Sequence, residues 1–236
     1  MSESNVTPEQ AAAAPQYKAE DFFIVLLPSR TRQFFINTAL ILAEVHHDLD
    51  KLLLMIPSGA PGGFAAVRQG CVDKLKETLD ENGIAHGPVV RALWLDDDIL
   101  IDEPISRVSA AIKKADEIHA NIVANYRIPW HNDTIVNSIG LPGPDGVPHF
   151  ATSEELAALK NWQQLPPRSH AGLGFYYGDV PLDYKYHYDY ASKEDQLKAK
   201  SWFDLPKAED VNFYYDNKIT LTYVDLTLKH DKHVLL

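Results

Sequence analysis

Five short apolar segments limit the folds that this chain can adopt. Each is rich in Val, Ile, Leu or Phe, and together they cover residues 22–28, 51–57, 89–95, 120–128 and 219–230. Their apolar residues are nearly continuous, whereas a strand with one solvated face alternates apolar and polar residues. We therefore expect strands that are buried on both faces, in a mostly parallel sheet with helices on either side.

Helical patterns separate these segments. Apolar residues recur at helical spacing in 32–47, 64–82 and 103–119, and the second pattern ends before Gly83, a residue suited to the end of a helix. Strands that alternate with helices are the signature of a doubly wound α/β fold. The fold class that we predict is a single α/β, Rossmann-like domain.

The second half of the chain departs from this alternation. Residues 129–150 hold four prolines and three glycines, which predicts an irregular insert and a candidate lid. Thr152 and Glu155 stand at the spacing of a capping box, so a short helix is expected to follow. Two further helical patterns cover 192–204 and 207–215.

Composition limits the partners and the location of the protein. Its 22 basic and 33 acidic residues give a formal net charge of −11, which disfavours, without excluding, binding to nucleic acid through phosphate neutralisation. Cys71 is the only cysteine, so no internal disulfide can form and a reducing compartment is expected.

No targeting or membrane segment is recognisable in the sequence. No apolar run approaches the ~20 residues that span a bilayer. Residues 1–20 lack both the basic start and the apolar core of a signal peptide. We expect a disordered tail over 1–20, one domain over 21–236, and a cytoplasmic protein.

Three adjacent aspartates, Asp96, Asp97 and Asp98, follow the predicted strand 89–95. Two carboxylates about 4 Å apart repel by roughly 4 kcal/mol at the effective dielectric of a protein surface. In open α/β sheets the carboxyl ends of the strands form the ligand-binding edge, and carboxylates suit hard cations such as Mg²⁺ or Mn²⁺. The alternative is an acidic turn that stabilises the N-terminus of the next helix.

These aspartates lie in LWLDDDILI (93–101), which resembles the DxD motif of the GT-A fold family of nucleotide-sugar glycosyltransferases. Other similarities follow in the order of that family, over about residues 22–230. They are IVLLPSRTR (first strand and nucleotide-binding loop), GFAAVRQGCVDKL (a helix that often carries an Arg-Asn pair), HAGLGF (a glycine-rich loop), AEDVNFYYD (the xED motif) and ITLTYVDLTLKH (the closing strand). Gln69 stands where Asn is usual, which leaves the role of its helix open.

The resemblance implies a GT-A-like domain with an acceptor-side insert and a Mn²⁺ or Mg²⁺ cofactor. Asp98 would ligate the metal directly, and Asp96 would contact a metal-bound water or the donor ribose. His230 would complete the metal site, with His233 as the competing choice.

The resemblance also assigns residues to donor binding, in four segments. They are Pro28, Arg30 and Thr31; Arg68; Asp96 and Asp97; and Gly172 and Gly174. Arginine forks suit phosphate, and glycines permit positive φ and close approach of the backbone to a ligand. Exposed loop arginines, an exposed turn residue at Asp97 and a plain tight turn at the glycines are the alternatives.

Asp210 resembles the acidic residue that acts as general base in inverting members of the family. Its neighbour Glu209 could instead bind the acceptor. Acidic residues are also favoured in the first turn of any helix, which is the competing explanation for both.

The activity implied is transfer of a sugar from a nucleoside-diphosphate sugar, most simply a UDP-sugar, to an acceptor hydroxyl. Glycans, proteins, small molecules and modified nucleobases all remain open as acceptors, as does retention rather than inversion. The alternatives are a nucleotidyltransferase, disfavoured because LLPSRTR (26–32) has no glycine, and a non-catalytic binding domain. Compact members of this fold also occur in viruses, in which case the location would be the host cytoplasm.

Overall fold

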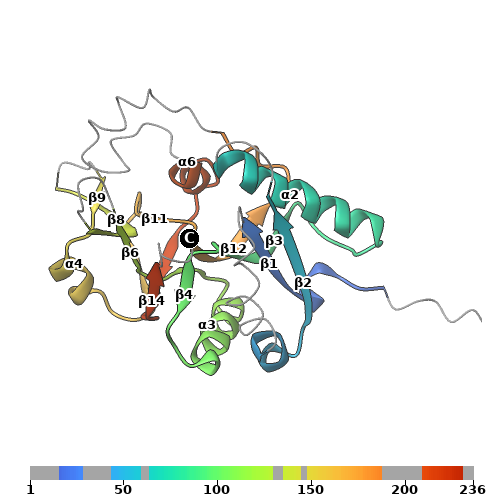
Figure 1. Ribbon diagram of the computed structural model, residues 1–236, viewed down its shortest axis with the longest axis horizontal. Coiled ribbons are helices and arrows are strands. Elements are labelled where there is room, and N and C mark those ends of the chain that lie inside the picture. The colour runs from blue at the N-terminus through green and yellow to red at the C-terminus, as the bar shows by residue number, and fades with distance from the viewer. Residues whose placement is uncertain are drawn as a thin grey trace, which may run out of the picture.

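A seven-stranded sheet forms the centre of the molecule (Figure 1). The structure is a computed structural model that describes residues 16–28, 44–59, 64–129, 135–144, 148–187 and 209–230. The strands of the sheet are β1 (Phe22–Pro28), β2 (Leu52–Ser58), β3 (Val89–Leu95), β5 (Asn121–Val123), β10 (Gln163–Gln164), β12 (Phe175–Pro181) and β13 (Leu221–Tyr223). Their order is β10-β13-β5-β12-β3-β1-β2.

The sheet is mostly parallel, as predicted. β1 runs parallel to both β2 and β3, and β5 runs parallel to β13. β12, which the sequence did not predict as a strand, lies antiparallel between β3 and β5. Because β12 is antiparallel to both neighbours, β3 and β5 share one direction, so five strands end at the same edge of the sheet. The short edge strand β10 is antiparallel to β13.

Helices cover both faces of the sheet, so the core forms two layers. In Figure 1, α2 (Phe64–Glu81) and α6 (Glu209–Asp216) lie above the sheet and α3 (Ile105–Glu117) lies below it. β3 serves both layers: Ala92 and Trp94 pack in the α2 cluster, and Leu93 and Leu95 pack in the α3 cluster. This double burial explains why the strand reads as one continuous apolar run.

Several predicted elements are confirmed close to their expected bounds. The segments 22–28 and 89–95 are β1 and β3, and the helices expected at 64–82 and 103–119 are α2 and α3. Gly83 follows α2 with φ +61°, a backbone conformation that glycine adopts without strain. A 3-10 turn, Ala19–Asp21, precedes β1.

The remaining predicted helices are described only in part. Residues 44–49 are helical and overlap the end of the pattern at 32–47. The rest of that pattern and the pattern at 192–204 lie outside the described residues. The helix expected at 207–215 is α6.

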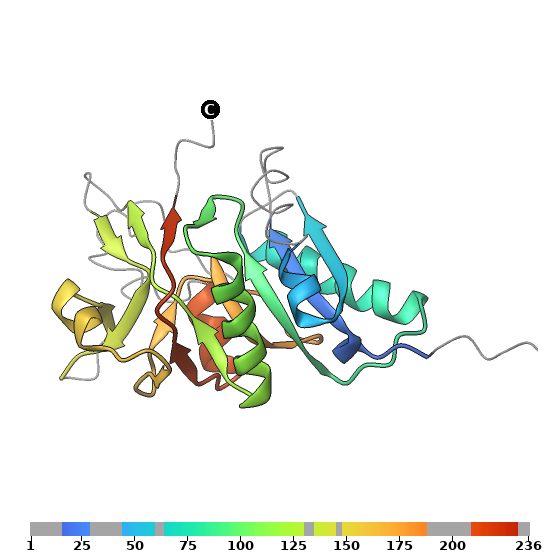
Figure 2. The ribbon, with the colours of Figure 1, turned by 90° about the horizontal axis from the view of Figure 1, so that it is seen from below.

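Two segments predicted as single strands are each divided between two sheets. Segment 120–128 forms β5 and then β6 (Arg127–Pro129), which pairs with β7 (Ile135–Asn137). Segment 219–230 forms β13 and then β14 (Leu228–His230), which pairs antiparallel with β4 (Ile99–Ile101). Figure 2 shows the red β14 beside the green segment that contains β4. The single-strand prediction was wrong because the second half of each segment has a different pairing partner.

The insert at 129–150 is more regular than predicted. It contains β7, β8 (Ile139–Pro142) and β9 (Pro148–Phe150), and β11 (His170–Ala171) joins β8 and β9 in a small sheet. Its prolines fall where a missing N–H costs least, since Pro142 ends β8 and Pro148 begins β9. The helix α4 (Ser153–Ala158) follows with the predicted capping box: Glu155 N–H donates to Thr152 Oγ1 at 3.1 Å, and Thr152 N–H donates to the Glu155 carboxylate at 2.8 Å.

Candidate functional site

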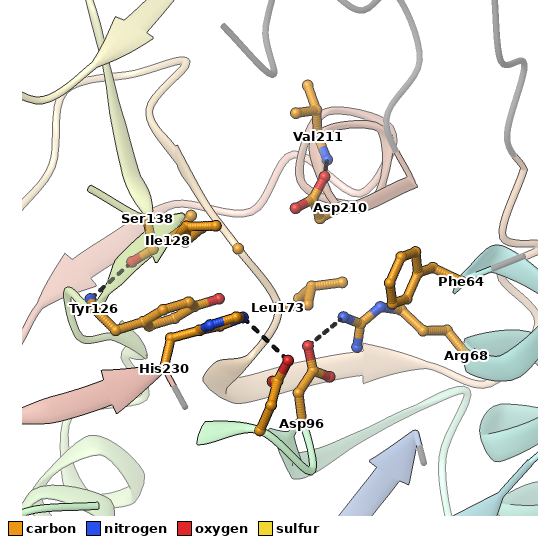
Figure 3. A pocket seen from close by; sticks show the side chains of 13 residues that line it. Phe64, Arg68, Asp96, Tyr126, Ile128, Ser138, Leu173, Asp210, Val211 and His230 are labelled. Atoms are coloured by element: carbon orange, nitrogen blue, oxygen red, sulfur yellow. Dashed lines mark hydrogen bonds and ion pairs between the residues drawn. The ribbon is translucent and has the colours of Figure 1, made fainter. Parts of the chain in front are cut away.

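A cavity lies where the aspartate turn after β3, the start of α2, the N-terminus of α6 and the end of β14 meet (Figure 3). It holds about 700 Å³ of empty space, counted out to its mouth. Its lining residues are Phe64, Arg68, Asp96, Asp98, Tyr126, Ile128, Ser138, Ala171, Gly172, Leu173, Asp210, Val211 and His230. Six of them, Arg68, Asp96, Asp98, Gly172, Asp210 and His230, were assigned to the site from the sequence.

Asp96 is held in place through both its backbone and its side chain. Its N–H donates to the Gly174 carbonyl at 3.1 Å, and its own carbonyl accepts from Ile99 N–H at 3.2 Å. Arg68 Nη2 donates to Asp96 Oδ2 at 3.2 Å. Oδ1 of the same carboxylate is buried and has no hydrogen-bond partner in the part of the chain that the structure describes. Burial raises the pKa of Asp96 above its usual value, an effect that Arg68 opposes and Asp98 reinforces.

Asp98 and His230 meet because β14 pairs with β4. The register places His230 opposite Ile99, the residue next to Asp98. His230 Nε2 lies 3.1 Å from Asp98 Oδ2, and both side chains are mostly buried. The imidazole stacks on the ring of Tyr126, with centroids 6.3 Å apart and planes 9° from parallel. Two residues far apart in the sequence therefore present one oxygen and one nitrogen side by side.

These donors suit a divalent ion that completes its coordination with water and substrate. Among the described residues, no three His, Cys, Asp or Glu side chains are grouped closely enough to form a ready-made metal cage. Mg²⁺ is usually bound through one or two carboxylates, with waters and substrate phosphates in the other positions. Asp98 Oδ2, His230 Nε2 and the unpartnered, buried Asp96 Oδ1 are donors of the kind that such a site needs.

Arg68 is the cationic wall of the cavity. It belongs to α2, is only 3% exposed, and places its guanidinium over the Trp94 ring at 5.2 Å from the centroid. A buried guanidinium needs anionic or aromatic partners, and the structure supplies Asp96 and Trp94. Gln69, the next residue, faces elsewhere: it bonds Asp73 at 2.7 Å and accepts from Tyr186 N–H at 2.8 Å. It therefore ties the segment after β12 to α2 and does not line the cavity.

The glycines of the loop after β11 allow the side chain of Tyr126 to approach the backbone closely. Gly174 N–H donates to the Tyr126 hydroxyl at 3.1 Å. A Cβ on Gly174 would lie 2.5 Å from that hydroxyl oxygen, and a Cβ on Gly172 would also collide with it. Neither glycine has positive φ, and Gly83 is the only described glycine that does. At these two glycines the side chain of Tyr126, rather than a positive φ, disfavours larger residues.

Asp210 faces the aspartate turn from the first turn of α6, with its carboxylate in the cavity lining. Its Oδ1 accepts from Val211 N–H at 2.9 Å (Figure 3). Burial raises the pKa of Asp210 to about 6, although the positive charge of Arg68 works in the opposite direction. The acidic pair was expected at the start of a helix, and that position is confirmed.

The other predicted site residues are not placed in the cavity. Asp97 lies in the aspartate turn but does not line the cavity. Pro28, which is buried at the end of β1, does not line the cavity either. Arg30, Thr31 and His233 lie outside the described residues, and so does the side chain of Glu209.

Sequence reasoning missed the part of the wall formed by Tyr126, Ile128 and Ser138. These residues belong to segment 120–128 and the insert, which were expected to be a plain strand and an irregular loop. The one available signal was Tyr126, a polar aromatic residue inside an apolar run. Phe64, at the opposite wall, lies in the quoted segment GFAAVRQGCVDKL, but no role at the site was assigned to it from the sequence.

Comparisons with known proteins give no family assignment. No protein-family model matches the sequence, and no curated protein matches it. A structural match exists to the crystal structure of A197 from STIV, with 16% sequence identity and a TM-score of 0.46. It covers 90% of this chain and 85% of that one. Among the described helices, none has the length and apolar character to cross a membrane.

Proposed function

We propose that this protein is a metal-dependent glycosyltransferase that moves a sugar from a nucleoside-diphosphate sugar to an acceptor hydroxyl. One observation carries the proposal: Asp96 and Asp98, Asp210 and His230 come from three distant segments and line one cavity with Arg68. A motif resemblance of short segments becomes stronger when the segments meet in space. The sequence similarity to the DxD-containing family supplies the reaction class.

Asp98 Oδ2 and His230 Nε2 would hold the metal, Mn²⁺ or Mg²⁺, and Asp96 would hold a metal-bound water or the donor ribose. When bound, the ion would neutralise the negative charge that develops on the departing diphosphate. The stacking of His230 on Tyr126 fixes the plane of the imidazole before any ligand arrives.

Arg68 holds Asp96 in place and opposes the rise in its pKa that burial causes. Without the guanidinium, burial would favour the protonated acid, which is a poor acceptor and a poor ligand. Its bond to Asp96 also orients the carboxylate, leaving Oδ1 for the substrate or a bound water.

Asp210 would be the general base that takes the proton of the acceptor hydroxyl. A general base works best when its pKa lies near the working pH, and a pKa of about 6 leaves most of the carboxylate ionised at pH 7. It is then more basic than an ordinary aspartate. Attack from the Asp210 side, opposite the departing diphosphate, would invert the anomeric carbon.

The experiment is a nucleoside-diphosphate release assay. UDP-, GDP- and TDP-sugars are incubated with the protein in Mn²⁺, Mg²⁺ or EDTA, and the diphosphate is measured. We expect slow hydrolysis of one donor, a UDP-sugar, that needs the metal. Release of pyrophosphate from a nucleoside triphosphate and a sugar phosphate would instead identify a nucleotidyltransferase.

Two neighbouring variants make the assay specific for the site. Asp98→Asn should abolish release, whereas Asp97→Asn removes the same charge one residue away, outside the cavity lining, and should leave most of the activity. No release from any donor, together with no metal-dependent stabilisation by any of them, would refute the transferase proposal and favour a binding domain.

A further inference from the structure

Tyr126 is a wall residue of the cavity to which the sequence assigned no role. It lies between β5 and β6 and is 4% exposed. Its backbone is held on both sides by Ser138: Tyr126 N–H donates to Ser138 Oγ at 3.0 Å, and Ser138 N–H donates to the Tyr126 carbonyl at 2.8 Å. These two hydrogen bonds hold the backbone from which the ring extends, and stacking on His230 holds the plane of the ring.

Among the described residues, the hydroxyl of Tyr126 accepts one hydrogen bond and donates none. It accepts from Gly174 N–H at 3.1 Å, and that contact uses its acceptor side. A phenol can donate as well as accept, and a buried donor without a partner is costly. Since the glycine loop presses on the oxygen from one side, the O–H hydrogen is left to point toward the open cavity.

The Tyr126 ring is directed into the cavity from a position near both Asp210 and Asp96, two of its three acidic lining residues. Figure 3 shows the Tyr126 side chain directed into the cavity, with Asp210 on one side and Asp96 on the other. A tyrosine hydroxyl has an ordinary pKa of about 10, so it is protonated at neutral pH and can donate a hydrogen bond. It is therefore a permanent donor.

We propose that the Tyr126 hydroxyl donates a hydrogen bond to a hydroxyl oxygen of the transferred sugar and so helps select that sugar. The inference rests on the proposed function. In that reaction the diphosphate lies at Asp96, Asp98 and His230, and the acceptor hydroxyl lies at Asp210. The sugar ring must lie between them, and that is where the O–H of Tyr126 points.

The test compares two ligands that differ only in the sugar. Dissociation constants for UDP and for the UDP-sugar hydrolysed fastest by the wild type are measured calorimetrically with Mn²⁺. If the wild type hydrolyses a GDP-sugar or TDP-sugar faster than any UDP-sugar, that sugar nucleotide and its nucleoside diphosphate are used in place of the UDP-sugar and UDP. Tyr126→Phe keeps the stacked ring and removes only the hydroxyl.

The matched control is Tyr177→Phe. Tyr177 is also almost fully buried, and its hydroxyl donates to Asp116 Oδ1 at 2.6 Å, away from the cavity lining. Both variants lose one buried hydroxyl, so a general loss of stability affects both, and circular dichroism checks folding. Gly172→Ala is the second variant at the site, because its Cβ would push the Tyr126 hydroxyl aside without deleting it.

Tyr126→Phe should weaken binding of the UDP-sugar about three- to tenfold, the effect of losing one neutral hydrogen bond, and leave UDP binding unchanged. Tyr177→Phe should change neither. Equal weakening of both ligands, or no change in either, would overturn the role in sugar recognition while leaving the transferase proposal intact. A wild-type protein that binds no nucleotide would overturn both.

Discussion

Asp210 can be tested before any substrate is known, because a buried carboxylate affects folding. Its pKa is raised to about 6 in the folded protein from an ordinary value of 3.8. The folded state therefore binds a proton more tightly than the unfolded state does. The contribution of Asp210 to stability is then highest below about pH 4 and falls as the pH rises toward and past 6, where the folded protein must hold a desolvated negative charge.

The magnitude follows from the two pKa values. Each tenfold difference in proton affinity corresponds to about 1.4 kcal/mol, so the ionised Asp210 costs up to about 3 kcal/mol of unfolding free energy at neutral pH. Asp210→Asn removes that charge. Asn also keeps an Oδ1 acceptor for the Val211 N–H, so the start of α6 should be preserved.

The assay is urea unfolding of the wild type and Asp210→Asn between pH 4 and 8, in EDTA. We expect the variant to be more stable by about 1–3 kcal/mol at pH 7–8, with the difference vanishing near pH 4, where both side chains are neutral. Titrations of groups that do not interact with Asp210 cancel in the comparison. A stability difference between the two proteins that does not change with pH would show that Asp210 is not desolvated. So would a wild type that is more stable than Asp210→Asn at pH 8. Either result would remove the physical basis for the role of Asp210 as base.

Two further predictions concern the scaffold of the site. Gly174→Ala should destabilise the protein by about 1–3 kcal/mol, because its Cβ would lie 2.5 Å from the Tyr126 hydroxyl and 3.0 Å from Ile99 Cγ1. Gly87→Ala, whose Cβ would meet nothing closer than 3.7 Å, is the control in the same urea assay, and equal stabilities would refute the steric argument. Thr152→Ala should cost about 1 kcal/mol through loss of the α4 cap, measured as faster amide exchange at Glu155; unchanged exchange would contradict it.

The sequence predicted those strands whose burial is continuous. β1 and β3 keep their expected bounds because both faces of each strand are covered. The same continuity hid the division of segment 219–230. Val224 and Leu226 between its two strands are 1% and 7% exposed, so nothing in the pattern marks the change of sheet.

β12 was missed because Gly178 and Pro181 look like turn residues. In the structure Gly178 lies inside the strand, where a Cβ would collide with the Asn121 side chain. That amide accepts from Asp179 N–H at 2.8 Å and from the Tyr176 hydroxyl at 3.2 Å. The glycine is therefore required by a neighbour from β5, a contact that the local sequence does not contain.

The part of the site that could be predicted consists of charged and histidine side chains near the ends of strands and helices. Asp96, Asp98, Asp210 and His230 each lie at or next to the end of a strand or helix, and all four line one cavity. Tyr126 was not predictable in this way. Its place in the wall depends on a break in segment 120–128 and on packing against two glycines from another part of the chain.

The central claim is that Asp98 and His230 hold a divalent ion that receives a nucleoside diphosphate. The most direct measurement is a titration with Mn²⁺, with and without UDP, in which electron paramagnetic resonance measures the concentration of free Mn²⁺. It is made for the wild type, Asp98→Asn and Asp97→Asn. We predict that UDP strengthens Mn²⁺ binding to the wild type, that Asp98→Asn weakens it at least tenfold, and that Asp97→Asn behaves as the wild type. Mn²⁺ binding that is equal in all three proteins would contradict the claim.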